Sequence, residues 1–465
     1  MIQLALIPLA LAAFLLFRRY GMTSVMHPGV WFSLAWILAI GCYTLTDWFN
    51  GVPVHNPDQM NELLMFLVLT SAAFVLCARL FPAGRRLQRA TFLEVNSRLL
   101  VIAGGTGFVA ALVNWYILTG GSLYSEEVRQ QWLVEIPVVT ARLWWLYLAT
   151  YPAAFVSAYQ MTSDFIYRSK KRQQVRFAFG FSIAAGMFWS FGTGGRQAFG
   201  LVVLHAMAGF ALSLGFNLKQ IAGRALFRAL RKTVVVTLSL VAALCIGGEV
   251  TGRMREEQQG SSRPSTFGDV PFLGLVSVFV DYMGGPIATY QAYGPAARRD
   301  LSETGSVSLA GLQEFGIAYL AGWRSPERLD TNPERAKPWL PLFSGTRCVF
   351  YDLVADFGVA GAMLAVTLLV LFSQTLFSLT TEPKMILPSA PLVMMLMFWG
   401  YSHQLSLLMY SSPKWLFISF GVWDLVHHCF HGRRQPLPAA IFWRPFRPGC
   451  PRPRGTALHS WKTAG

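Results

Sequence analysis

Charged residues are scarce in this chain: only 13% of its 465 residues are Asp, Glu, Lys or Arg, whereas 54% are hydrophobic. A soluble domain of this length needs fewer apolar residues for its core, so the composition excludes an ordinary soluble protein. The sequence therefore predicts a membrane protein that crosses the bilayer many times. A formal net charge of +16 would favour nucleic-acid binding in a soluble chain, but here it reports which loops are cytoplasmic. We expect no nucleic-acid partner.

Several motifs with a defined chemical purpose are also absent. No GxxxxGK(S/T) loop occurs, which argues against an ATP-driven pump. HExxH and CxxC patterns are missing, and the spacing of the six cysteines indicates no disulfide framework. His427, His428 and His431 straddle the end of the last apolar run, where solvated interfacial histidines are a simpler interpretation than a metal site. We expect neither a metal nor a cofactor.

Apolar runs of the length needed to cross a bilayer, roughly 20 residues, recur along the chain. The eleven predicted spans cover residues 2–17, 29–45, 61–80, 99–119, 143–162, 177–192, 199–216, 233–250, 357–380, 385–409 and 413–430. The predicted fold class is all-α, a polytopic integral membrane protein with about 11 transmembrane helices and one large extracytoplasmic loop. The predicted organisation is spans one to eight in 1–250, the large extracytoplasmic loop in 251–356, spans nine to eleven in 357–430, and a basic Pro/Arg-rich cytoplasmic tail in 431–465 that we expect to be disordered.

Loops rich in Lys and Arg alternate with loops that are poor in them. Residues 163–176 carry five basic side chains, whereas the loop "DWFNGVPVHNPDQ" (47–59) carries no Lys or Arg. Because cytoplasmic loops collect basic residues, the alternation predicts an external N-terminus and a cytoplasmic C-terminus. The loop at 251–356 then lies on the outer side.

The stretch "FGTGGRQAFG" (191–200) connects two apolar runs on the predicted outer face. Its glycines allow a ligand to approach the backbone closely, and the guanidinium of Arg196 can bind phosphate oxygens in bidentate fashion. A helix that opens here adds N–H groups suited to an anion. The alternative is an arginine that snorkels at the membrane interface beside glycines that turn the chain.

Two further stretches on the same face combine acids with aromatic residues. In "FVDYMGGPIATYQAYG" (279–294), Asp281 and Tyr282 precede a Gly-Gly-Pro break, an arrangement that suits a sugar but equally a turn with interfacial tyrosines. "LFSGTRCVFYDLVADFGVAG" (342–361) enters span nine through Arg347, Tyr351 and Asp356. Asp356 is either the N-cap of that helix or an acid that faces a water-filled cavity.

A fourth stretch, "FWGYSHQLSLLMYSS", puts His403 and Gln404 towards the outer end of span ten. Polar residues inside a membrane usually have a function, but a core histidine with satisfied hydrogen bonds is the simpler interpretation.

Taken in order, these stretches resemble the oligosaccharide repeat-unit polymerases, the Wzy-type O-antigen and exopolysaccharide polymerases. In that family a Gly/Ser-rich turn with an arginine opens a helix, a Y-x-x-G-P element occupies a large outer loop, and a DFG-x-x-G element follows an aromatic pair. The matching pieces here are "TGGRQAFG", "DYMGGPIATYQAY" and "TRCVFYDLVADFGVAG", within roughly residues 170–370. The family often has an Asn and a Thr upstream of its DFG element, where this chain reads "FSGTRCVFYDLVA", so the motif does not fix the roles of Thr346 and Arg347.

The resemblance implies a GT-C-like glycosyltransferase of the bacterial inner membrane. The growing polysaccharide on undecaprenyl pyrophosphate would move to the non-reducing end of a new lipid-linked repeat unit. Its partners would be the lipid-linked oligosaccharide, membrane lipids, and a chain-length regulator and a flippase of the same pathway. Cationic groups would stabilise the departing pyrophosphate and a base would accept the proton of the attacking hydroxyl, without a cofactor.

On this resemblance, each group of candidate residues has a role. The candidates for contact with the pyrophosphate are Arg196 first, then Arg324 and Arg347. The candidates for the base or for sugar contacts are Asp281, Asp356 and His403. The candidates that would line the sugar path are Tyr282, Trp323 and Tyr351.

Two alternative functions stay open. An O-antigen ligase would share the lipid-pyrophosphate donor, the many spans and a large outer loop. A flippase or transporter for lipid-linked oligosaccharide would carry more charges deep within its spans and would lack so large a loop.

Overall fold

The computed structural model describes residues 2–50, 56–81, 96–123, 125, 128, 138–167, 172–193, 197–217, 227, 231–240, 242, 243, 246, 279, 280, 283–291, 348–379, 385–403 and 412–431. All regular structure in these ranges is helical, as predicted. Within the same ranges, seven helices are long and apolar enough to cross a membrane. The chain is therefore an all-α membrane protein, and the total of eleven spans stays a prediction.

The described helices overlap the predicted spans, except that the predicted span at 233–250 is described only in part. They are η1 (Ile2–Ala5), α1 (Leu6–Tyr20), η2 (Gly21–Met26), α2 (Pro28–Asn50), α3 (Pro57–Leu80), α4 (Ser97–Thr119), α6 (Val138–Tyr147), α7 (Thr150–Tyr167), α8 (Arg172–Thr193), α9 (Gln197–Asn217), α14 (Val349–Leu379), η5 (Leu387–Ser389), α15 (Ala390–Tyr401) and α16 (Ser412–His431). Helices α6 and α7 together occupy the predicted span at 143–162, interrupted by a turn at Leu148 and Ala149.

Polar side chains define several helix ends. Asn56 precedes Pro57 and accepts a hydrogen bond from the backbone N–H of Asp58 at 3.1 Å, so α3 begins at a capped position. Asp424 of α16 accepts from the N–H groups of Ile386 and Leu387 at 3.0 and 2.7 Å, and so caps the start of η5 and α15. The buried carboxylate of Asp424 therefore ties the last helix to the one before it.

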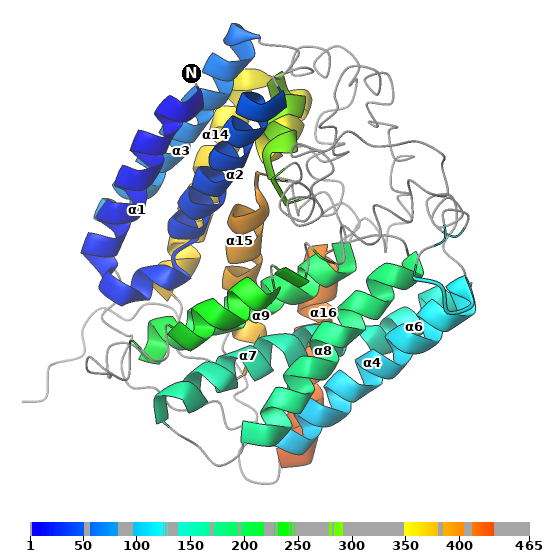
Figure 1. Ribbon diagram of the computed structural model, residues 1–465. Coiled ribbons are helices and arrows are strands. Elements are labelled where there is room, and N and C mark those ends of the chain that lie inside the picture. Colours follow the sequence, from blue (N-terminus) through cyan, green and yellow to red (C-terminus); the bar gives the residue numbers. More distant parts are fainter. Residues whose placement is uncertain are drawn as a thin grey trace, which may run out of the picture.

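One group of helices contains α1, α2, α3, α14 and α15. Figure 1 shows α1, α2, α3 and α14 side by side, and α15 contacts α2 and α14. Its interior is rich in buried aromatic rings: Phe66 stacks on Phe350 with centroids 5.1 Å apart, and Phe32 meets Trp399 edge to face at 5.4 Å. Such ring pairs stabilise a core beyond the effect of the buried area alone.

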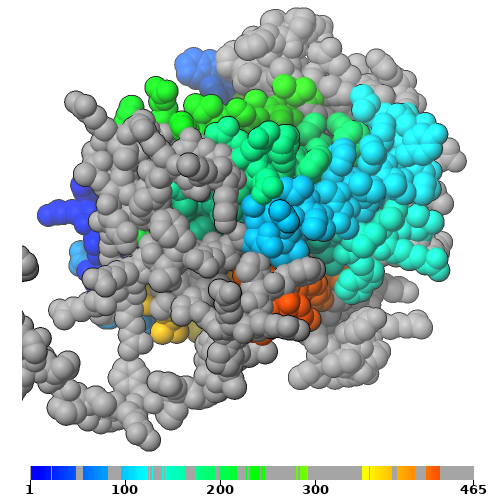
Figure 2. Space-filling view, turned by 90° about the horizontal axis from the view of Figure 1, so that it is seen from below, coloured from blue at the N-terminus to red at the C-terminus, as the bar shows by residue number. Residues whose placement is uncertain are grey.

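The second group contains α4, α6, α7, α8, α9 and α16. Helices α4 and α8 run in the same direction, as contacts at both of their ends show. Ser97 donates to Gln174 where both helices begin, and Gly192 packs on Trp115 near the end of both. The chain therefore crosses back through α6 and α7 between them, as the predicted spans require. In Figure 2 the cyan and green helices of this group fill one side of the face, and the blue α1 lies at the opposite edge.

The two groups meet at α9, α15 and η2. Helix α9 contacts α15 and η2, and α15 contacts α16. At the end of α9, a side chain added to Gly215 would collide with Met26 of η2. Helix α9 lies in the interior, because 83% of its most apolar stretch of 18 residues is buried. In the corresponding stretch of Ile2–Tyr20 only 28% is buried, so α1 lies on the outside.

Helix α14 differs from the predicted span nine. It begins at Val349, eight residues before the predicted start at 357, and it is broken at Gly358, whose φ of 66° and ψ of 177° only glycine adopts readily. The segment before the break is helical because Val349, Phe350 and Leu353 bury their side chains in the first group. Asp356 has a helical backbone two residues before the break, so it is not the N-cap of the helix that follows, and that interpretation was wrong.

Candidate functional site

A helical segment from the predicted large loop, residues 283–291, packs into the first group of helices. The Tyr43 hydroxyl of α2 donates to Oε1 of Gln291 at 2.7 Å, and the Tyr290 hydroxyl donates to Oε1 of Glu62 on α3 at 2.5 Å. A Cβ atom at Gly284 would lie 2.8 Å from the backbone of Tyr43. Glycine is therefore required in "MGGP" because the segment rests directly on the backbone of α2.

The same segment contacts the start of α14 and the end of α15. The rings of Tyr290 and Tyr351 lie 6.4 Å apart and nearly perpendicular. Nε2 of His403 lies 3.2 Å from Sδ of Met283. These contacts bring together three of the four stretches that the sequence singles out. The three begin at residues 279, 342 and 398.

We call these residues, together with Asp352 next to Tyr351 in the sequence and His403 against Met283, the polar cluster. Its members are Tyr43, Glu62, Tyr290, Gln291, Tyr351, Asp352 and His403. Asp352 lies in the first turn of α14, where the helix dipole stabilises a negative charge. Six of the seven members are buried, and Glu62 is the one that is partly exposed. Glu62 is therefore the most accessible member of the cluster.

The buried surroundings change the chemistry of a cysteine next to the cluster. Burial, and to a smaller extent the charge of Asp352, raises the pKa of the Cys348 thiol to about 12. The thiol stays protonated at neutral pH, and the thiolate is the nucleophilic form. Cys348 is therefore a packing residue and not a nucleophile.

Of the nine predicted site residues, the structure describes the side chains of two. Tyr351 is a member of the polar cluster, in contact with Tyr290. His403 is buried against Met283, and its Nδ1 has no hydrogen-bond partner among the described residues. Asp356 is described only in its backbone. The residues that lie outside the described part of the chain are Arg196, Asp281, Tyr282, Trp323, Arg324 and Arg347.

Sequence reasoning named Tyr351 and His403 as site candidates but not the other five members of the cluster. Glu62 carried a usable signal, since an acid just inside an apolar run is unusual and often functional. Tyr43 and Gln291 carried none, because a tyrosine near a helix end and a glutamine in a loop are common. Their importance depends on a contact between residues 248 positions apart.

No group of three or more His, Cys, Asp or Glu side chains that could hold a metal ion occurs in the ranges that the structure describes. Comparisons of the chain with protein-family models, with curated proteins and with solved structures found no match. The functional interpretation therefore depends on the residues of the polar cluster.

Proposed function

We propose that this protein is a membrane glycosyltransferase that polymerises lipid-linked oligosaccharide repeat units at the outer face of a bacterial inner membrane. The observation that supports the proposal is the convergence of the start of α14 and the end of α15 on the 283–291 segment, whose Tyr290 also donates to Glu62. The 283–291 segment and the start of α14 belong to the stretches on which the resemblance to the repeat-unit polymerases depends. In this proposal the cluster faces the periplasm, the N-terminus is periplasmic and the C-terminus is cytoplasmic.

The proposed reaction is a glycosyl transfer between two lipid-linked sugars. A hydroxyl oxygen of the acceptor forms a bond to the anomeric carbon of the donor. The bond between that carbon and the pyrophosphate breaks, and its electron pair leaves with the undecaprenyl pyrophosphate. The proton of the acceptor hydroxyl passes to a base, and cationic groups stabilise the charge of the leaving group.

The described residues suit the sugar side of this reaction. Glu62 offers a carboxylate at the accessible edge of the cluster, and carboxylates accept hydrogen bonds from sugar hydroxyls. Because His403 is buried against Met283, we assign it the role of holding the 283–291 segment against α15. Asp281 and Asp356 are then the candidates for the base, and Arg196, with Arg324 and Arg347, for the pyrophosphate contact.

The first experiment tests the cluster in cells. Tyr290→Phe removes the donor to Glu62 while keeping the ring, and we expect the glycan ladder on a gel to collapse towards single repeat units. Tyr116→Phe is the matched control, since this tyrosine of α4 is 65% exposed, and its ladder should equal that of the wild type. Ladders of normal length in both Tyr290→Phe and Glu62→Gln would contradict the proposed site.

The second experiment separates the polymerase from the two alternatives. Purified protein supplied with lipid-linked repeat units in detergent should lengthen them without a second compartment, which a flippase requires. In cells that lack the gene, a single retained repeat indicates a polymerase, whereas loss of every repeat-bearing species indicates a ligase or a flippase.

A third experiment tests the proposed pyrophosphate contact. Arg196→Ala should abolish long polysaccharide, and Arg196→Lys should rescue poorly because lysine lacks the planar fork of donors. Chains of normal length in Arg196→Ala would exclude this role for Arg196.

A further inference from the structure

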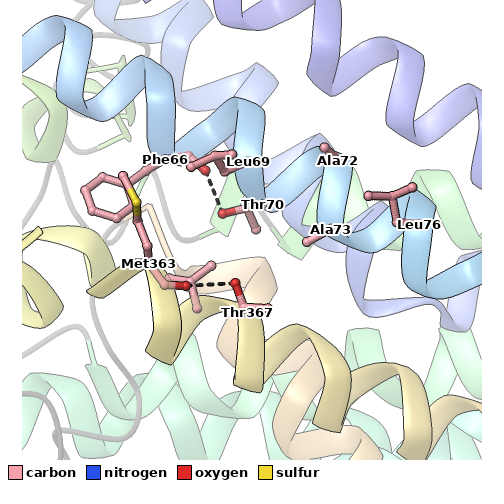
Figure 3. A pocket seen from close by; sticks show the side chains of 9 residues that line it. Phe66, Leu69, Thr70, Ala72, Ala73, Leu76, Met363 and Thr367 are labelled. Atoms are coloured by element: carbon pink, nitrogen blue, oxygen red, sulfur yellow. Dashed lines mark hydrogen bonds between the residues drawn. The ribbon is translucent and has the colours of Figure 1, made fainter. Parts of the chain in front are cut away.

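Serine and threonine hydroxyls on the described helices often bond within their own helix. Thr70 and Thr367, beside the groove between α3 and α14 in Figure 3, each donate to a carbonyl oxygen four residues earlier, at 2.7 and 2.8 Å. Ser190, near the end of α8, is different. Its Oγ accepts a hydrogen bond from the backbone N–H of Phe199 in α9, with the two atoms 3.0 Å apart. This bond joins two consecutive helices.

The bond lies where the start of α9 needs an acceptor. Helix α9 begins at Gln197, so Phe199 is its third residue, and its N–H is one of the first four that have no carbonyl partner within the helix. The residue before a helix usually supplies the acceptor from its side chain. Here that residue is Arg196, and a guanidinium carries donors only. Ser190 therefore provides the cap that an arginine in this position cannot.

Close packing holds Ser190 against the start of α9. Gly186 lies one turn earlier on the same face of α8. A Cβ atom at Gly186 would lie 3.2 Å from side-chain atoms of Phe199 and Val202, so the two helices are in direct contact one turn away from the hydrogen bond. The small residue and the serine thus act together, one allowing the close approach and the other supplying the acceptor.

A third helix supports the same connection. Tyr147 of α6 stacks on Trp189 with ring centroids 4.4 Å apart, and its hydroxyl donates to the carbonyl oxygen of Ala198 at 3.4 Å. Trp189 and Ala198 each adjoin one partner of the hydrogen bond between α8 and α9 in the sequence. The end of α8 and the start of α9 are thereby held on both sides of the connection that carries Arg196.

We infer that Ser190 is a positioning residue, which caps α9 from α8 and so fixes the start of the helix that follows Arg196. The inference rests on the proposed function, in which the guanidinium of Arg196 contacts the pyrophosphate. Because consecutive Cα atoms are about 3.8 Å apart, a fixed Gln197 restricts the positions that the guanidinium can reach. Ser190 acts through Arg196 and does not itself contact the substrate.

Hydrogen exchange of the full-length protein in detergent tests the cap. Ser190→Ala removes the acceptor, and the amides at 197–200 should exchange roughly fivefold faster, as expected for the loss of an N-cap. Ser190→Thr keeps a hydroxyl and should restore the wild-type rate. Ser182→Ala is the matched control, since this buried serine of α8 donates to the carbonyl oxygen of Ala178 at 2.9 Å, within its own helix, and the rate at 197–200 should not change.

Unchanged exchange at 197–200 in folded Ser190→Ala would overturn the inference. If Ser190→Ala does not fold, Ser190→Cys provides a milder change, because sulfur accepts hydrogen bonds only weakly.

A double-mutant cycle tests whether Ser190 acts through Arg196. The measured quantity is the Kd of undecaprenyl pyrophosphate for the purified protein. Ser190→Ala should weaken binding severalfold, because only molecules with an ordered start of α9 present Arg196 correctly. In the Arg196→Ala background the same change should have no further effect.

Equal weakening by Ser190→Ala in both backgrounds would assign Ser190 a purely structural role and overturn the inference. Weaker binding that depends on Arg196, in a protein that does not polymerise repeat units, would instead contradict the proposed function and leave the positioning role intact.

Discussion

The two groups of helices rely to different degrees on glycine packing and on side-chain hydrogen bonds. In the second group the closest approaches are made by glycines: a Cβ at Gly209 of α9 would lie 2.2 Å from the carbonyl oxygen of Phe155, and one at Gly104 of α4 would lie 2.8 Å from that of Ala178. In the first group, side-chain hydrogen bonds join distant segments, such as Trp36 to Ser402 at 3.0 Å. Helices in a bilayer associate by close packing and by hydrogen bonds, and the two groups rely on these to different degrees.

The two kinds of contact have different consequences for ligand binding. Close backbone packing fixes helices rigidly but offers few polar groups to a ligand. Directional hydrogen bonds fix the register of segments that arrive from far along the chain, including 283–291 and the start of α14. The first group thus carries the polar cluster, and the close packing of the second group fixes the helices α8 and α9 that flank Arg196 in the sequence.

The largest effect should follow from breaking the glycine packing. Gly209→Ala puts a methyl group into the carbonyl of Phe155, so α9 and α7 must separate. We expect a loss of about 3 kcal/mol or more in the free energy of unfolding, the upper end for overpacking, measured by thermal unfolding in detergent. Gly200→Ala in the same helix meets no atom within 4 Å and should be neutral or slightly stabilising. Equal melting temperatures for the two variants would remove the proposed contrast.

The next effect concerns the break in α14, where the first group depends on one glycine. Gly358→Ala meets no atom within 4 Å, so any destabilisation comes from the backbone conformation alone. The expected cost is about 1–3 kcal/mol, because φ of 66° with ψ of 177° is nearly exclusive to glycine. Gly180→Ala in α8, which is helical and equally uncrowded, is the control and should not destabilise. A wild-type melting temperature for Gly358→Ala would show that the break is not required.

A smaller loss of folding stability, which appears only at acidic pH, should come from His27 in the turn between the first two spans. Its Nδ1 accepts from the N–H of Gly29 at 3.0 Å, and its Nε2 donates to Oε1 of Gln374 at 2.8 Å. Burial lowers the pKa of His27 to about 4, only partly opposed by the hydrogen bond to Gln374. The neutral ring is therefore the form that the fold stabilises.

The direction in which stability changes with pH follows from the protonation of His27 in the folded and unfolded protein. The unfolded chain binds the proton near pH 6.5, before the folded protein does, so the stabilisation is complete above pH 6.5 and declines as the pH falls towards 4. At pH 5.5 the loss should be roughly 1.4 kcal/mol, and His27→Gln should lack it. Melting temperatures at pH 7.5 and 5.5 for both proteins measure the difference. Parallel declines in the two would assign the pH dependence to other groups.

Hydropathy predicted the described helices well, because the length and apolarity of a span are local properties. The start of α14 was missed since "CVFYDLV" contains polar and aromatic residues, and only burial among distant helices makes it helical. The polar cluster was predicted in part: Tyr351 and His403 were named, whereas Glu62 was not. Its pairing with Tyr290 spans 228 positions, and no local pattern contains that information.

The smallest effect is the most direct test of the contrast between the groups. Tyr43→Phe removes the donor to Gln291 without changing the packing of the ring on α2. A double-mutant cycle with Gln291→Leu should give a coupling of about 0.6–1 kcal/mol, the usual range for such bonds inside membrane proteins. Because this bond fixes where segment 283–291 rests, Tyr43→Phe should shorten the glycan ladder more than its small loss of stability explains. A coupling near zero would mean that the close backbone contact at Gly284 holds the segment and that the first group, too, depends on glycine packing.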